Sequence, residues 1–288
     1  IEPTFTVAIP VFNMAGYISD ALDAVLDQSL PVTEILIVDD CSTDNLQEVL
    51  SKYQDPRIRF FKFDENQGHM SAHNFMVTEA KGNFYVPFSA DDRITPDYIQ
   101  KVYDQFKENP WIEFCASQTD FMDKDGVHIT EPKEPFHQGA MNIAKPVNQT
   151  RESLLANLYH GNQYFGIGMY RTSVLREVGG WDKRYGVLAD YEMYLRLLQR
   201  ENIRVVEEPL TRTRLHDNNQ SNMAVNKPSE KLSLKDLYHL ARKPYFAPRL
   251  KVIIATPFYE MKAFSPYVSS LATTIKLLTM LGIEHEFW

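Results

Sequence analysis

Hydrophobic and polar positions follow two alternating patterns along the first ninety residues. Short apolar runs of the kind that form buried strands occur at 5–12, 34–40, 58–63 and 84–88. The segments between these runs carry apolar residues at helical spacing, at 14–28, 45–54 and 70–81. Strands that alternate with helices predict an α/β fold, with a Rossmann-like, mostly parallel sheet and helices on both of its faces.

The chain is less regular after residue 90. Apolar residues at helical spacing recur at 96–108, 151–159 and 189–200, and strand-like runs lie near 112–119 and 203–207. The stretch 123–150 carries three prolines and two glycines and is long for a connection between elements. We therefore expect a functional flap in this stretch.

A change of pattern near residue 220 predicts how the chain divides. A polar stretch and a helix at 229–241 follow the last predicted strand, and a strand–helix–strand pattern restarts near residue 250. The restart indicates either a second α/β domain or a docking segment. The expected division is a first domain at 1–225, a helical linker at 226–249 and this further segment at 250–288.

Composition and charge narrow the class of protein. The chain has 288 residues, of which 44% are hydrophobic and 24% charged, and its formal net charge is −8. This acidic balance disfavours nucleic acid or an anionic membrane as the main partner. The apolar segment 263–283 is interrupted by Ser, Thr and Lys, so it predicts an amphipathic helix instead of a membrane span.

Two further features bear on the compartment and on the ends of the chain. Cys41 and Cys115 are far apart and lack metal-ligand spacing, so we expect free thiols in a reducing, cytoplasmic compartment. The sequence begins at Ile1, not at Met, and stops at Trp288 just after a helical pattern. We therefore expect it to be a piece of a longer protein.

Polar residues gather where the first four predicted strands end. In chain order they are Pro10 and Asn13, Asp39-Asp40, Asn66 and Gly68, and Asp91-Asp92. The carboxyl ends of parallel strands meet at one edge of a sheet, which we call the rim. Open α/β sheets bind their ligands outside this edge, so the rim is the predicted binding site.

Asp91 and Asp92 raise an electrostatic question, because two adjacent carboxylates at the end of a buried strand repel each other unless a cation lies beside them. In a chain without a Zn-type His/Cys cluster, carboxylates suit a hard cation such as Mg²⁺ or Mn²⁺. The pair thus predicts a metal that arrives with a diphosphate. His216 could supply a further ligand, which would favour Mn²⁺, and Asp39 could accept a nucleobase N–H.

Each of these residues also has a structural alternative. The Asp91-Asp92 pair could begin a turn or a helix, and the stretch 39–44 could form turns and an N-cap. Asp190 could cap the helix that it opens, and His216 could lie on the surface. The sequence has no G-x-G-x-x-G after its first strand and no P-loop motif, which disfavours nicotinamide cofactors and P-loop chemistry.

The joint order of these motifs resembles the family 2 glycosyltransferases, GT-A fold enzymes that use nucleotide-diphospho-sugars. The resemblance covers residues 5 to about 220. It rests on five segments: IPVFN (9–13), EILIVDDCSTDNLQEVL (34–50), ENQGHMSAHN (65–74), FSADDR (88–93) and VGGWDKRYGVLADYEMYLRL (178–197). Each segment alone is a weak signal, whereas five in this order and spacing are highly specific.

The resemblance implies an inverting single displacement with a UDP-sugar as the expected donor. Asp190 would be the general base, Asp92 and His216 would bind the metal, and Asp91 would contact the ribose or the sugar. Trp181 and Asp182 would face the acceptor. The other residues implied in nucleotide and donor binding are Pro10, Phe12, Asn13, Asp39, Asn66, Gly68 and Asn74.

Departures from the family pattern leave the substrates open. Ala189 stands where the family often has Glu before the base, and no Q-x-x-R-W signature follows His216. Transfer of one sugar or a few to a glycan or another hydroxyl acceptor is therefore expected. A nucleotidyltransferase that makes sugar nucleotides is an alternative, although it usually has a Gly-rich, basic loop after the first strand. A non-catalytic nucleotide- or sugar-binding domain is the other alternative.

Overall fold

The computed structural model of the chain describes residues 2–130, 167–198, 203–217, 219, 252–254 and 285–287. Its N-terminal elements are β1 (Phe5–Val11), α1 (Ile18–Leu26), β2 (Glu34–Asp39), α2 (Leu46–Leu50), β3 (Ile58–Lys62), α3 (His69–Glu79) and β4 (Phe84–Pro87). β1 pairs in parallel with β2 and β4, and β2 pairs in parallel with β3. The predicted alternation of parallel strands and helices is therefore confirmed for this half.

The second half turns the sheet into a mixed one. Its elements are β5 (Arg93–Ile94), α4 (Tyr98–Glu108), β6 (Phe114–Met122), β7 (His128–Ile129), β8 (Gly168–Arg171), α7 (Thr172–Val178), η1 (Lys183–Leu188), α8 (Ala189–Leu198) and β9 (Ile203–Arg214). The strand order is β3-β2-β1-β4-β8-β6-β9-β5, with β7 beside β6. β8 lies antiparallel between β4 and β6, and β9 is parallel to β6 but antiparallel to β5. Because β8 is antiparallel to both of its neighbours, β6 and β9 run in the same direction as β1 to β4, and the expectation of a mostly parallel sheet is confirmed.

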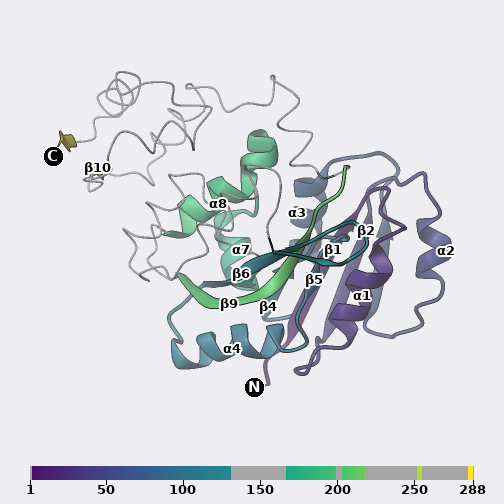
Figure 1. Cartoon of the computed structure of the whole chain (residues 1–288), viewed down its shortest axis with the longest axis horizontal. Coiled ribbons are helices and arrows are strands. Elements are labelled where there is room, and N and C mark those ends of the chain that lie inside the picture. Colours follow the sequence, from purple (N-terminus) through teal and green to yellow (C-terminus); the bar gives the residue numbers. More distant parts are fainter. Residues whose placement is uncertain are drawn as a thin grey trace.

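Helices cover both faces of the sheet, as Figure 1 shows. One apolar cluster joins β1 to α1 and α4, and the other joins β2 to α3, α7 and α8. All residues of β1 and β2 are buried, because each of these central strands has helices over both of its faces. This packing fixes where the strands end and thereby fixes the rim.

β9 differs most from its prediction. The apolar run 203–207 is only its first part, and the strand continues through a polar stretch to Arg214. A register shift against β6 occurs before this polar part, near Pro209, and the last residues then pair with β5 as well. These pairings carry the end of β9 to the rim.

Two short strands lie apart from this sheet in the sequence. β10 (Val252–Ile254) and β11 (His285–Phe287) pair with each other in parallel. The predicted helices at 151–159 and 229–241 and the linker at 226–249 lie outside the described residues, as does the part of the predicted flap beyond residue 130. Among the described residues, no helix has the length and apolarity needed to cross a membrane.

Candidate active site

The loops after β1 and β2 are fastened to each other. The backbone N–H of Asn13 donates to Oγ of Ser42 at 3.0 Å, and Oδ1 of Asn13 accepts the backbone N–H of Thr43 at 2.8 Å. The side chain of Asn13 therefore holds the loop after β2 in place, and its Oδ1 is occupied by this hydrogen bond. Pro10, expected after the strand, lies within β1 and is buried, whereas Phe12 is 44% exposed at the rim.

The two carboxylates at the end of β2 have different partners. Asp39 accepts the backbone N–H of Ser42 at 2.7 Å, and its other oxygen lies 3.4 Å from Nζ of Lys62. Asp40 accepts the backbone N–H groups of Gln67 and Gly68 at 2.7 and 2.8 Å. Asp40 thus anchors the loop before α3. Gly68 has a φ of 88°, which favours glycine, and Asn66 is exposed in the same loop.

Arg214 is the cation beside Asp91 and Asp92 that inspection of the sequence missed. Its backbone N–H donates to Oδ1 of Asp92 at 3.0 Å, and its Nε donates to the backbone carbonyl of Asp91 at 2.7 Å. Burial of the Asp92 carboxyl and the charge of Asp91 raise the pKa of Asp92 well above its ordinary value, against the effect of Arg214. The Asp92 side chain is therefore turned into the protein.

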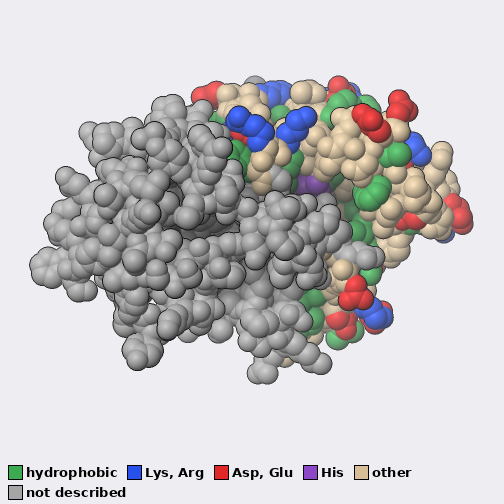
Figure 2. Space-filling view, turned by 90° about the horizontal axis from the view of Figure 1, so that it is seen from above, with side chains coloured by type: hydrophobic (Ala, Val, Ile, Leu, Met, Phe, Trp, Pro, Cys, Tyr) green, Lys and Arg blue, Asp and Glu red, His purple; other side chains and the backbone are tan. Residues whose placement is uncertain are grey.

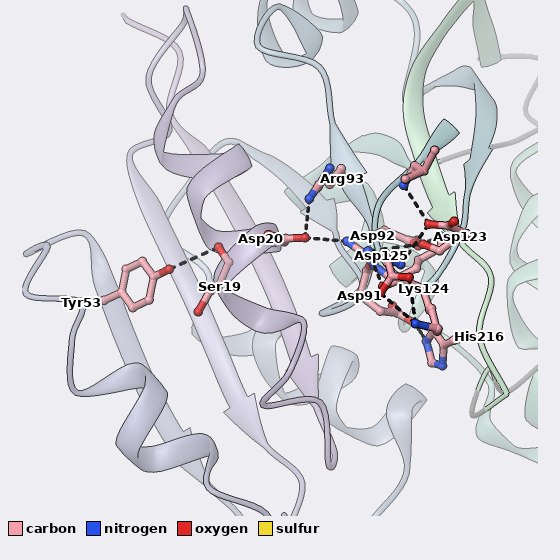
Figure 3. A network of polar contacts seen from close by, with 12 residues as sticks. Ser19, Asp20, Tyr53, Asp91, Asp92, Arg93, Asp123, Lys124, Asp125 and His216 are labelled. Atoms are coloured by element: carbon pink, nitrogen blue, oxygen red, sulfur yellow. Dashed lines mark hydrogen bonds and ion pairs between the residues drawn. The ribbon is translucent and has the colours of Figure 1, made fainter. Parts of the chain in front are cut away.

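His216, expected to bind the metal together with Asp92, contacts the neighbouring carboxylate of Asp91. Its Nε2 lies 2.9 Å from Oδ2 of Asp91, and the side chains are 4% and 14% exposed (Figure 3). The ring of Tyr17 stacks on the imidazole at a centroid distance of 4.8 Å. The Asp92 carboxyl, the other expected metal ligand, accepts a backbone N–H of β9 through Oδ1, and its role in metal binding stays a prediction.

The spacing of the Asp91–His216 pair suits two ligands of one divalent cation. Carboxylate oxygens and histidine nitrogens bind such ions at about 2.0–2.2 Å, so two neighbouring ligands of an octahedral ion lie about 3 Å apart. The separation of 2.9 Å between Oδ2 and Nε2 fits this requirement. Within the described ranges, no group of three or more His, Cys, Asp or Glu side chains could hold a metal ion.

Asp190 lies at the start of α8 and keeps an exposed surface. The surrounding protein raises the pKa of its carboxyl by desolvation, while the charge of His69 and the indole N–H of Trp181 act in the opposite direction. The indole nitrogen is buried and has no hydrogen bond of full geometry to any described residue. Its N–H is directed toward Asp190 and favours the ionised carboxylate.

Two residues expected at the substrate belong to the protein interior. Trp181 is 2% exposed and packs against His73 and Tyr170, at ring distances of 5.2 and 5.8 Å. The side-chain amide of Asn74 makes two hydrogen bonds to the backbone of Trp181. Its Nδ2 donates to the Trp181 carbonyl at 2.7 Å, and its Oδ1 accepts the Trp181 N–H at 2.8 Å. Both residues are thus held by contacts inside the protein while they also line the pocket between α3 and η1, and their expected roles toward the acceptor and the nucleotide stay predictions.

His69 is a candidate that the motif analysis did not identify. It is the first residue of α3, and its ring contacts that of His73 at 4.6 Å. Burial lowers the pKa of His69, and the charges of Asp190, Asp91 and Asp40 oppose this effect. The imidazole therefore lies among the carboxylates of the site. Its place directly after Gly68, at a helix start on the rim, was the available signal.

A pocket of about 590 Å³ lies between α3 and the loop before η1. Ser71 and Asn74 line it on the α3 side, and Asp182, Lys183 and Arg184 line it on the other. Its volume lies within the range of small-molecule sites. Asp182 accepts hydrogen bonds from Arg184, the shortest at 2.6 Å. In Figure 2, Lys and Arg side chains gather near a histidine at the border with the residues that are not described.

Several curated proteins are similar in sequence to this chain. An uncharacterised glycosyltransferase of Rickettsia typhi is 25% identical over 80% of this chain and 69% of its own length. A putative teichuronic acid biosynthesis glycosyltransferase of Bacillus subtilis is 34% identical over 44% of this chain and 51% of its own length. The chondroitin synthase of Pasteurella multocida is 25% identical over 76% of this chain, which spans only 21% of that protein.

Solved structures share the fold. TarS of S. aureus, in complex with UDP-GlcNAc, has a TM-score of 0.63 and 20% identity over 83% of this chain and 64% of its own. A mannosyltransferase of Pyrobaculum calidifontis, in complex with GDP-Man and Mn²⁺, has a TM-score of 0.55 and 17% identity, over 86% of this chain and 64% of its own. The α/β fold of GT-A type is thus confirmed. The sequence model of glycosyl transferase family 2 matches residues 6–179, so the chain belongs to glycosyl transferase family 2.

Proposed function

We propose that this chain transfers a sugar from a nucleotide-diphospho-sugar to an acceptor hydroxyl with inversion at the anomeric carbon. Family membership supports the reaction class. The observation that carries the proposal is the Asp91–His216 pair on the rim, which fits a cation of the kind that accompanies a diphosphate. Because the matched proteins are longer than this chain, the activity of the whole protein is included in the proposal.

The proposed metal ligands are Asp91 and His216, with Mn²⁺ or Mg²⁺ as the ion. This assignment replaces the pair Asp92 and His216, because the Asp92 carboxyl accepts the backbone N–H of Arg214. The ion, when bound, supplies Lewis-acid stabilisation of the leaving diphosphate. The mixed oxygen and nitrogen donors suit Mn²⁺ somewhat better than Mg²⁺.

Asp190 is the proposed general base. Its carboxylate would take the proton of the acceptor hydroxyl while the hydroxyl oxygen forms a bond to the anomeric carbon and the bond to the diphosphate oxygen breaks. The electron pair of the broken bond leaves with the nucleoside diphosphate. The raised pKa of Asp190 supports this role, because a stronger base accepts the proton more readily.

The proposal also assigns the regions that bind the donor and the acceptor. Asp39 would accept an N–H of the nucleobase, and the exposed Phe12 would contact the base or the ribose. Asn66 would contribute from its exposed position in the loop before α3. The acceptor would enter beside Asp182, in the pocket between α3 and η1. Asn13 and Gly68 would act through the loop conformations that they fix.

Calorimetry with UDP, GDP, CDP and dTDP, each with Mn²⁺ and with EDTA, tests this proposal. We expect one nucleotide to bind only with metal, and Asp91→Asn to lose that binding. Asp125→Asn is the matched control, since this carboxylate is on a nearby turn and is 67% exposed beside Lys124. Failure of all four nucleotides to bind in every condition would refute the proposal. Release of a nucleoside diphosphate, and not pyrophosphate, from the donor separates transfer from nucleotidyltransfer.

A further inference from the structure

Arg214 is an almost fully buried cation at the centre of the rim. Its side chain is 1% exposed, although it ends β9 close to the candidate metal pair. Figure 3 shows the network that runs from Asp20 on α1 across to His216. A buried guanidinium is costly unless its N–H groups find acceptors. The partners of Arg214 therefore define its function.

Each of its three side-chain nitrogens has an acceptor within the protein. Nε donates to the Asp91 carbonyl at 2.7 Å, and one terminal nitrogen donates to the Lys124 carbonyl at 3.1 Å. The other terminal nitrogen donates to Oδ2 of Asp20 at 2.8 Å. An arginine beside a diphosphate site is usually taken for a phosphate ligand. Here neither exposed surface nor an unused nitrogen remains for a phosphate.

The same contacts hold both members of the Asp91–His216 pair. Asp91 is held through its carbonyl, and His216 lies two residues after Arg214 on the same chain segment. Asn219 closes that segment: it donates to the Arg214 carbonyl at 2.9 Å and accepts the His216 N–H at 2.6 Å. The ring of Tyr17 lies 5.0 Å from the guanidinium carbon and stacks on the imidazole of His216.

We propose that Arg214 is a positioning residue that preforms the Asp91–His216 pair before a donor and metal arrive, without touching either. It fixes the main chain of Asp91 directly and the imidazole of His216 through Tyr17. Asp20 balances its charge. The inference rests on the proposed function only in that the pair is taken to serve the donor; the preformed geometry is a property of the free protein.

Arg214→Lys tests the inference, because lysine keeps the charge but cannot reproduce the fork of three nitrogens. In the ligand-free protein, ¹H–¹⁵N NMR of the histidine rings should show the His216 Nε2 resonance shifted away from its hydrogen-bonded position. The Kd for UDP with Mn²⁺ should rise about 10–100-fold, as for other residues that orient metal ligands. Arg93→Lys is the control: Arg93 also pairs with Asp20 but is 33% exposed on β5, and we expect both readouts to stay unchanged.

Tyr17→Leu is a second variant that tests the same inference if Arg214→Lys does not fold. This half-buried ring can be removed without stranding a buried charge, and the same NMR shift is expected in smaller measure. The inference is overturned if either variant folds and keeps the wild-type His216 resonance. If the wild type binds no nucleoside diphosphate, the proposed function fails, while the NMR comparison still decides the role of Arg214.

Discussion

Replacement of Asn74 by Ala separates a structural role from a nucleotide-binding role. The amide of Asn74 makes two hydrogen bonds to the backbone of Trp181. A net contribution of about 0.5–1.5 kcal/mol for each bond predicts a loss of about 1–3 kcal/mol in the free energy of unfolding. The upper half of this range is expected, because Trp181 is buried and its backbone N–H and carbonyl would lose their partners.

The assay pairs urea denaturation with calorimetric titration of UDP and Mn²⁺. Asn74→Ala should lower the urea midpoint and leave the Kd within about threefold, a change of about 0.6 kcal/mol or less. Asn66→Ala should do the reverse, because Asn66 is exposed on the rim and surface replacements change stability by only about 0.5 kcal/mol. If Asn74→Ala keeps the wild-type midpoint but loses nucleotide binding, the structural account of Asn74 is wrong.

Two further predictions concern the base and the stability of the sheet. Asp190→Asn should lower kcat by about 10²–10⁴-fold without changing the Kd of the donor. Because desolvation raises the pKa of Asp190, the rate of the wild-type enzyme should fall on acidification at a higher pH than it would with an Asp of ordinary pKa. A pH–rate profile of both proteins measures the two effects. Burial raises the pKa of Glu34, but hydrogen bonds from Lys81, Arg59 and Thr6 outweigh it and lower the pKa overall. Glu34→Gln should therefore cost about 1.5–3 kcal/mol at neutral pH, and the difference should disappear as the pH falls through the lowered pKa. Thermal melts of both proteins from pH 7 to pH 3 would show whether the two curves converge.

The parallel half of the sheet could be predicted because its information is local. β1, β2 and β4 are short apolar runs separated by amphipathic segments, so their order and direction follow from right-handed crossovers. The convergence of Asp39 and Asp91 on one rim follows from the same rule. The antiparallel insertion of β8 could not be predicted, because the pairing partners of a strand are set by distant segments and leave no periodicity in its own sequence.

Motif positions predict which residues lie near the rim better than they predict what the side chain of each residue contacts. Asn74 and Trp181 lie next to the site, yet the side-chain amide of Asn74 is hydrogen-bonded to the backbone of Trp181. Pro10 lies one step inside the strand that it was expected to follow. A motif marks which residue types recur together, whereas only coordinates show whether a side chain faces a ligand or supports one that does.

Arg214 shows why the charge of the site could not be read from the sequence. The stretch Thr211–Arg214 alternates Thr with Arg and resembles an exposed polar tail, and its pairing with β5 and β6 buries Thr211 and Arg214. The guanidinium groups of Arg93 and Arg214 both pair with the carboxylate of Asp20, while Arg214 contacts Asp91 through its backbone carbonyl and Asp92 through a backbone N–H. Asp92 is turned inward and Asp20 is paired with both arginines, so Asp91 beside His216 is the carboxylate of the three that is available to a ligand at the rim. Arg214 therefore offsets only part of the repulsion between the adjacent carboxylates, and it leaves Asp91 directed at the position where a divalent cation is proposed to bind.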